Sequence, residues 1–126
     1  MRFMMLVKGA EGQGQPPQAL FEAIGKLGAD ETKAGRMVET GGLLPSAAGA
    51  RVRLAGGKLT ITDGPFTEAK EVVGGFAVFE LPSKKAAVES ATAFMELHRT
   101  HWPGWEGETE IRPMEVADFS PQENKR

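Results

Sequence analysis

The chain has 126 residues, with 15 Lys and Arg, 17 Asp and Glu and a formal net charge of −2. This length is typical of a single domain, and the scattered, slightly acidic charge argues against binding to nucleic acid or to an anionic membrane. The absence of cysteine excludes disulfides and thiolate metal sites, and it fits a reducing compartment. The apolar run at residues 3–7 is too short for a signal peptide or a membrane span. We therefore predict one cytoplasmic domain over residues 1–119 and a polar tail over 120–126.

The first part of the chain predicts a strand and then a helix. Residues 2–8 are compact and apolar and stop at Gly9, which is typical of a buried strand. Apolar side chains then recur at helical spacing between residues 20 and 38. Pro16 and Pro17 suit the first turn of this helix, and Gly41 and Gly42 are expected to end it.

Two alternating segments, 51–55 and 58–62, flank Gly56-Gly57, which is the signature of a two-residue hairpin turn. The register that this turn imposes places the apolar side chains of both segments opposite one another on one face. We expect that face to lie in the core and the other face to lie in solvent. The predicted apolar pairs are Leu54 with Leu59 and Val52 with Ile61.

The second part predicts a strand, a helix and a last strand. Residues 72–81 form the longest and most central strand, and Ser83 caps a helix that Pro103 ends. Residues 108–116 form the last strand. The resulting fold is α+β, a ferredoxin-like sandwich with an extra β-hairpin, in which an antiparallel sheet carries two helices on one face. Because no helix covers the other face, we expect a homodimer formed through it.

A polar loop from Asp63 to Glu71 follows the hairpin. A carboxylate at the end of a strand can act as a base, so Asp63 is a candidate catalytic residue. Lys70 is a candidate contact for an anionic substrate, and Glu71 is a candidate polar contact beside it. The alternative is that Asp63 hydrogen-bonds the backbone of its own turn, while the other side chains are solvated.

His98 and His101, the only histidines, lie at three-residue spacing near the end of the second helix. No third ligand is evident, so we predict no metal site. His98 is a candidate acid or base because histidine titrates near neutral pH, and its alternative role is a core histidine bonded to backbone.

Trp102 is a candidate pocket wall or plain core, and Arg112 is a candidate carboxylate contact or a surface partner of Glu110. No phosphate-binding or nucleophile motif is present, so no cofactor is predicted.

The run Thr62-Asp63-Gly64-Pro65-Phe66-Thr67-Glu68-Ala69-Lys70-Glu71, with Gly74-Gly75-Phe76 after it, resembles the DGPF branch of the YCII-related family. Residues 2–8, 42–45 and 110–113 support the resemblance. It implies a dimeric α+β barrel of ferredoxin-like type, and some members occur beside or fused to extracytoplasmic-function sigma factors. A distant member is a dehydrochlorinase of a chlorinated hydroxyhydroquinone. Other branches carry a proposed His–Asp pair with an early histidine, which has no counterpart before His98 here.

Three functions follow as hypotheses. The first is a small-molecule-binding or regulatory dimer, with a sigma factor as a possible partner. The alternative is a small-molecule enzyme, either a lyase of dehydrochlorinase type or a hydrolase, which uses Asp63 or His98 as acid or base. The enzyme hypothesis predicts that the Asp63 loop and the end of the second helix line one cleft. In the third, the motif only builds its turn and a dimer.

Overall fold

The structure is a computed structural model that describes residues 1–115, 117 and 119. The predicted polar tail over 120–126 lies outside the described residues. The elements, in chain order, are β1 (Arg2–Gly9), α1 (Gln18–Lys33), β2 (Met37–Gly42), a 3-10 turn η1 (Ser46–Ala48), β3 (Ala50–Ala55), β4 (Lys58–Asp63), β5 (Val72–Glu80), α2 (Lys84–His101) and β6 (Gly107–Met114).

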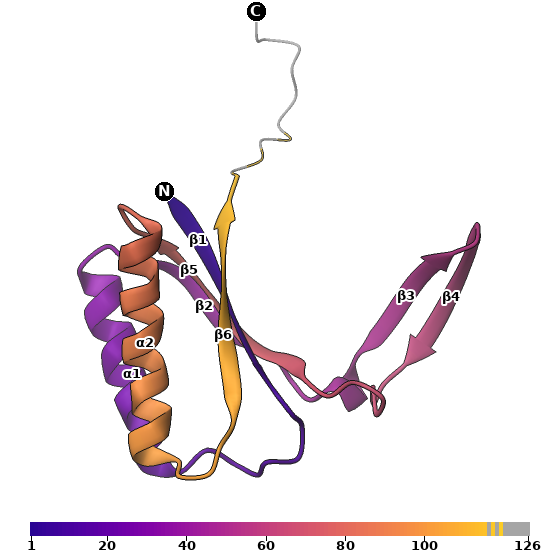
Figure 1. Cartoon of the computed structure of the whole chain (residues 1–126), viewed down its shortest axis with the longest axis horizontal. Coiled ribbons are helices and arrows are strands. Elements are labelled where there is room, and N and C mark those ends of the chain that lie inside the picture. The colour runs from indigo at the N-terminus through magenta and orange to yellow at the C-terminus, as the bar shows by residue number, and fades with distance from the viewer. Residues whose placement is uncertain (116, 118, 120–126) are drawn as a thin grey trace, which may run out of the picture.

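Four strands form an antiparallel sheet in the order β2-β5-β1-β6, and both helices cover one face of it (Figure 1). This is the ferredoxin-like α+β arrangement predicted from the sequence. The core lies between the sheet and the helices, where inward side chains of β1 and β5 meet the small residues of α2. Its buried members are Phe3, Met5, Phe79, Leu81, Ala87 and Ala91.

The first helix is shorter than predicted. It ends at Lys33, because Gly35 takes a positive φ of 76° and the N–H groups of Gly35 and Arg36 bond back to the last turn of the helix. Residues 37–42 then form β2, which the sequence analysis assigned to the helix and its end. The backbone partners that decide between these two conformations lie on β5, more than 30 residues further along the chain.

The second helix begins and ends as predicted. The Ser83 hydroxyl oxygen accepts a hydrogen bond from the Ala86 N–H at 3.1 Å, which satisfies a free donor of the first turn. Ala87, Ala91 and His98 are its buried residues. Within the described part of the chain, neither helix combines the length and the hydropathy needed to span a bilayer.

The predicted hairpin is present, but it lies outside the core. Its register pairs Leu54 with Leu59 and Val52 with Ile61, which confirms the pairing expected from the Gly56-Gly57 turn. These two strands form a separate two-stranded sheet, which projects from the body on the side away from the helices (Figure 1). The expectation that one face is core was wrong, because all twelve strand residues are exposed. We call residues 50–63 the arm.

The helix-free face of the four-stranded sheet carries Met4, Leu6, Phe76 and Val78, by strand alternation from the core residues. Val78 is only 5% exposed, and none of the four is strongly exposed. On the β6 side of this face, Lys8 contacts Glu110 at 2.7 Å and Glu108 at 3.2 Å. Strongly exposed apolar side chains lie instead on the arm, at Val52, Leu54, Leu59 and Ile61.

Candidate functional site

The candidate site lies at the end of the four-stranded sheet where β1 ends and β5 begins. Gly9 pairs there with Val72 on one side and with Gly107 on the other. The segment after β2 is held at the same end, because the Leu43 N–H donates to the Gly74 carbonyl oxygen at 2.9 Å. Three loops therefore meet beside the root of the arm. They span residues 10–17, 43–49 and 64–71.

A hydrogen-bonded clasp of Glu11, Ser46 and Phe66 joins these three loops. The Ser46 N–H donates to Glu11 Oε2 at 2.6 Å, and the Ser46 hydroxyl donates to Glu11 Oε1 at 2.5 Å. The same hydroxyl oxygen accepts a hydrogen bond from the Phe66 N–H at 3.1 Å. Ser46 is buried, and the clasp satisfies its polar atoms.

The Asp63–Phe66 segment packs backbone to backbone against the clasp. The Gly64 N–H donates to the Gly49 carbonyl oxygen at 2.9 Å. A Cβ atom on Gly64 would lie 1.7 Å from the Ser46 carbonyl oxygen and 2.6 Å from its carbonyl carbon. Only glycine fits this close approach. The motif is thus a turn that is fixed by contacts with distant residues, and it places Phe66 at the arm's root.

The clasp makes stability depend on pH. The Ser46 hydroxyl and then the Ser46 N–H lower the pKa of the Glu11 carboxyl group by bonding its charged form. Because the pKa of Glu11 is lower in the folded protein than in the unfolded chain, the ionised carboxylate stabilises the fold above about pH 5. This stabilisation is lost as the pH falls through the folded-state pKa. We expect Glu11→Gln to show a shallower loss of unfolding free energy in this acidic window than the wild type, measured by urea unfolding.

The matched control is Glu22→Gln, which removes an exposed carboxylate on α1 away from the clasp. It should keep the wild-type pH dependence. If Glu11→Gln also keeps it, Glu11 is not a stabilising partner of Ser46 in solution.

Arg51, at the start of the arm, lies over the ring of Phe66. Its guanidinium carbon is 3.9 Å from the ring centroid, and it forms an ion pair with Glu68. The backbone N–H of Glu68 and then Arg51 lower the pKa of the Glu68 carboxyl group. Both charged side chains are substantially exposed, so this ion pair contributes little to stability. A ligand carboxylate can therefore compete with Glu68 for Arg51.

Two clefts share a wall at this end of the sheet. The larger cleft has a volume of about 560 Å³ and the smaller about 260 Å³. Their common wall consists of Leu43, Leu44, Pro45, Val72 and Val73. Ser46, Arg51, Phe66 and Glu71 also line the larger cleft, whereas Glu11, Trp102 and Trp105 also line the smaller one. The clasp thus lies between the two clefts.

His98 lines a third cleft, of about 380 Å³, together with Trp102 and Trp105. Its Nδ1 lies 3.0 Å from the Phe94 carbonyl oxygen, and since a carbonyl can only accept, Nδ1 carries the proton. The imidazole ring centroid is 4.6 Å from that of Trp105, which stacks on Trp102 at 5.9 Å. These contacts match the core-histidine alternative.

The residues predicted from sequence are distributed unevenly over the three clefts. Glu71 lines the larger cleft, and Trp102 lines the smaller cleft and the His98 cleft. Asp63, Lys70 and Arg112 line none of the three, and Arg112 instead forms an ion pair with Glu110 at 3.1 Å. Asp63 and His98 are thus not brought to a common cleft.

Sequence reasoning missed three residues of the site: Glu11, Ser46 and Arg51. Glu11 lies in the glycine-rich loop between β1 and α1, to which no role was assigned from the sequence. Arg51 lies on the hairpin face that was expected to be in solvent. Glu11 and Ser46 are 35 residues apart, and no local pattern indicates their contact. A serine after Pro45 that begins a short turn is the only local signal, and it is weak.

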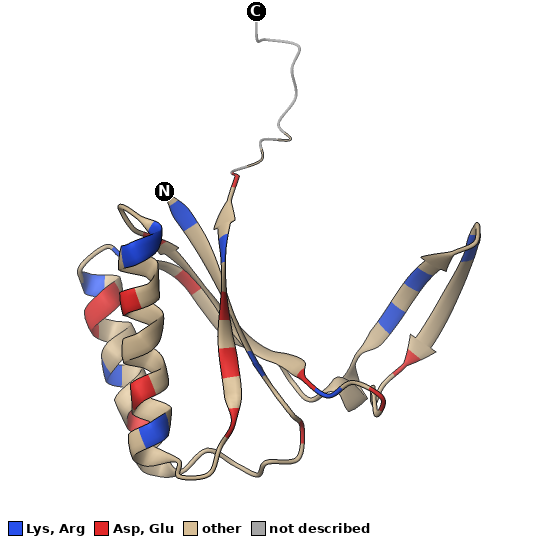
Figure 2. Ribbon diagram, in the orientation of Figure 1, with Lys and Arg blue, Asp and Glu red and all other residues tan. Residues whose placement is uncertain are grey.

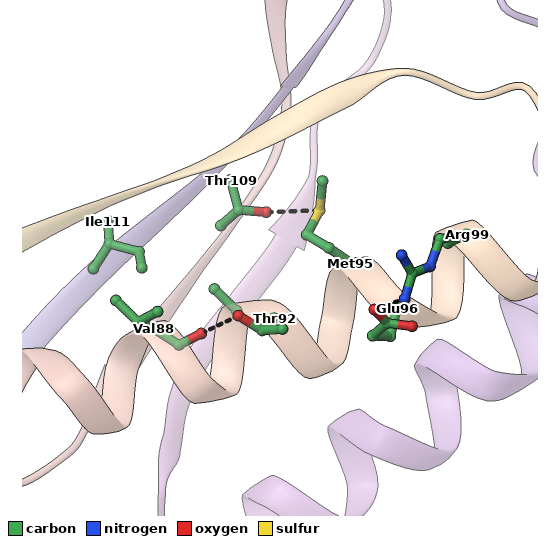
Figure 3. Close-up of a pocket in the computed structure, with 8 residues that line it drawn as sticks. Val88, Thr92, Met95, Glu96, Arg99, Thr109 and Ile111 are labelled. Carbon is green, nitrogen blue, oxygen red and sulfur yellow. Dashed lines mark hydrogen bonds and ion pairs between the residues drawn. The ribbon is translucent and has the colours of Figure 1, made fainter.

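A further groove, of about 330 Å³, lies between α2 and β6 (Figure 3). The polar side chains drawn there already bond to neighbours. The Thr92 hydroxyl donates to the Val88 carbonyl oxygen at 2.7 Å, Thr109 contacts the Met95 sulfur at 3.2 Å, and Arg99 pairs with Glu96. This groove is therefore a weaker ligand site than the clefts beside the clasp.

Residues 1–96 match the family model of the YCII-related domain. The chain belongs to the YCII-related domain family. The matched part runs from β1 into α2 and contains the clasp, the arm and the Asp63–Phe66 segment. No curated protein matches the chain. This match confirms the resemblance to YCII-related proteins, while assignment to the DGPF branch stays a prediction. The function of this YCII-related domain has to be argued from its site.

Proposed function

We propose that this YCII-related domain binds a small molecule in the larger cleft. The observation that carries the proposal is the cleft itself, whose volume of about 560 Å³ lies within the usual range for ligand sites. Its walls are mostly apolar, and the polar side chains of Ser46, Arg51 and Glu71 lie among them. Such a lining suits a ligand with an apolar body and a few polar groups.

The chemistry of the lining favours an aromatic carboxylate. Phe66 and Arg51 both line the cleft, and the guanidinium of Arg51 lies over the Phe66 ring, so a flat apolar group can pack in the cleft beside an aromatic ring and a cation. Arg51 can bind a carboxylate in bidentate fashion when it leaves its exposed partner Glu68. Glu71 accepts a hydrogen bond from a ligand hydroxyl or amine.

The test uses a panel of aromatic carboxylates that begins with benzoate and salicylate, with affinity measured by calorimetry. Arg51→Met keeps an unbranched, flexible side chain and removes its charge and its hydrogen-bond donors. We expect it to weaken binding by at least about 10-fold, because a charge-assisted hydrogen bond is lost. Arg53→Met is the matched control: Arg53 lies two residues further along β3 and does not line the cleft. Equal affinity of the Arg51→Met variant and the wild type, or no binding from the panel, contradicts the proposal.

The enzyme alternative has less support from the site. Its predicted acid or base is Asp63 or His98, but Asp63 lines none of the three clefts, and His98 lines a different cleft from the ligand and makes the contacts of a packed core residue. The catalytic roles of Asp63 and His98 stay predictions, as does a homodimer formed through the helix-free sheet face.

A further inference from the structure

The imidazole of His98 uses only one of its two nitrogens to hold its place in the fold. Nδ1 donates to the Phe94 carbonyl oxygen at 3.0 Å, so in the neutral ring Nε2 carries a lone pair and can only accept. No group among the described residues bonds to Nε2, yet every fully buried side-chain nitrogen and oxygen of these residues has a partner. Nε2 is therefore not sealed inside the protein, although His98 as a whole is only 7% exposed.

The opening beside this ring is the His98 cleft, whose volume of about 380 Å³ is sufficient for a small ligand. Its aromatic wall consists of Trp102 and Trp105, which are both half-buried and stack with their ring centroids 5.9 Å apart. Met95 adds a polarisable apolar side chain to the lining. The cleft thus holds a nearly buried acceptor among apolar groups, where an acceptor without a partner costs free energy.

The aromatic wall is fixed by contacts within the protein. The Trp105 N–H donates to the Trp102 carbonyl oxygen at 3.1 Å, and Gly104 between them has a φ of 89°, which glycine adopts readily. The Trp105 ring also lies directly on Gly107, where an added Cβ atom would overlap it. On its other side, its ring centroid is 4.6 Å from that of His98. Because the ring is already held in place, little conformational entropy is lost when a ligand binds.

The charge of the lining favours a neutral ligand. Arg99 and Glu106 line the cleft with opposite charges, and Arg99 already pairs with Glu96. Figure 2 shows that most of the turn that joins α2 to β6 is uncharged. A flat apolar body with one N–H or O–H group complements both the aromatic wall and the lone pair of Nε2. A ligand that can only accept would place its own lone pair against that of Nε2.

We propose that the His98 cleft is a second ligand site, which binds a neutral, planar compound through one N–H or O–H donor to His98 Nε2. Aromatic N–H heterocycles of the indole type are the simplest members of this class. The packing role of His98 is unchanged, because Nδ1 keeps its bond to Phe94 while Nε2 bonds the ligand. The His98 cleft shares no lining residue with the larger cleft, so this inference does not depend on aromatic carboxylates binding there.

The first experiment varies the ligand and leaves the protein unchanged. The wild type is titrated with indole and with 1-methylindole at about pH 8, where histidine is ordinarily neutral, and NMR follows the imidazole nitrogen signals. Indole is expected to shift the Nε2 signal of His98. 1-Methylindole has no N–H donor, so it is expected to bind at least about 5-fold more weakly and without that shift. No binding of indole, equal affinities of the two compounds, or an unshifted Nε2 signal overturns the proposal.

The second experiment varies the protein. His98→Phe keeps a packed aromatic ring and removes the acceptor, and it is expected to bind indole at least about 5-fold more weakly. The two tryptophans of the chain both line the cleft, so their two indole N–H signals report binding in every variant.

His101→Phe is the matched control, because His101 is the other histidine of α2 and does not line the cleft. It is expected to keep the wild-type affinity for indole. A folded His98→Phe variant that binds indole as tightly as His101→Phe contradicts the proposal. If His98→Phe does not fold, the comparison of indole with 1-methylindole on the wild type decides the question.

Discussion

Gly64→Ala is expected to lower the free energy of unfolding by about 2–3 kcal/mol, because overpacking of a closely fitted site costs this much. The added Cβ would lie 1.7 Å from the Ser46 carbonyl oxygen, and this neighbour is backbone that cannot rotate away. Relief of the overlap has to separate the Asp63–Phe66 segment from the turn at Ser46. The hydrogen bonds from Gly64 N–H to Gly49 and from Phe66 N–H to the Ser46 hydroxyl are then lost.

Urea unfolding measures the loss of stability, and amide hydrogen exchange locates it. The Gly64 and Phe66 amides should lose protection in the variant, while those of β1 and β5 change less. Gly42→Ala is the matched control, because Gly42 has open space where its Cβ would lie and no positive φ. A Gly64→Ala variant as stable and as protected as Gly42→Ala would show that the motif is not packed against Ser46.

His98→Ala is expected to destabilise the protein by about 2–4 kcal/mol through a cavity and a lost buried hydrogen bond. The imidazole is 7% exposed and donates to the Phe94 carbonyl oxygen, and its ring packs between Phe94 and Trp105. Thermal and urea unfolding test this directly. If His98 were instead a solvated ligand contact, its removal would change stability by less than about 0.5 kcal/mol.

His101→Ala is the matched control for this prediction. His101 is the last residue of α2 and only half-buried. Its substitution should cost much less than that of His98. Calorimetry with the aromatic carboxylate panel completes the comparison: a packing role for His98 predicts unchanged affinity in any His98→Ala protein that remains folded.

The local elements could be predicted because short-range interactions decide them. The Gly56-Gly57 turn fixes which residues of β3 and β4 face each other, and the Ser83 hydroxyl caps α2 from within the same turn. The Asp63–Phe66 run identifies the family through residue identity alone. For the hairpin and the helix cap, the interacting residues are near one another in sequence. For the family, the residue identities of the motif are sufficient.

The end of α1 and the start of β2 could not be predicted from local residue spacing. An apolar residue at position 38 fits the helical stripe, and the glycines at 41 and 42 resemble a helix end. The chain instead leaves the helix at Gly35, and β2 forms because β5 offers it an edge to pair with. Strand formation depends on that distant edge, so local spacing could not select it.

The sequence by itself determined the family, the α+β class, the hairpin register and the turn at Asp63–Phe66. The tertiary structure decided what that turn is for: it packs on Ser46, which bonds Glu11, and so forms one side of a cleft beside Arg51. It also decided that the hairpin lies outside the core. The physical reason is the same for the packing of the turn and for the position of the hairpin. Burial and hydrogen-bond partners come from segments far apart in the chain, and local residue spacing does not indicate them.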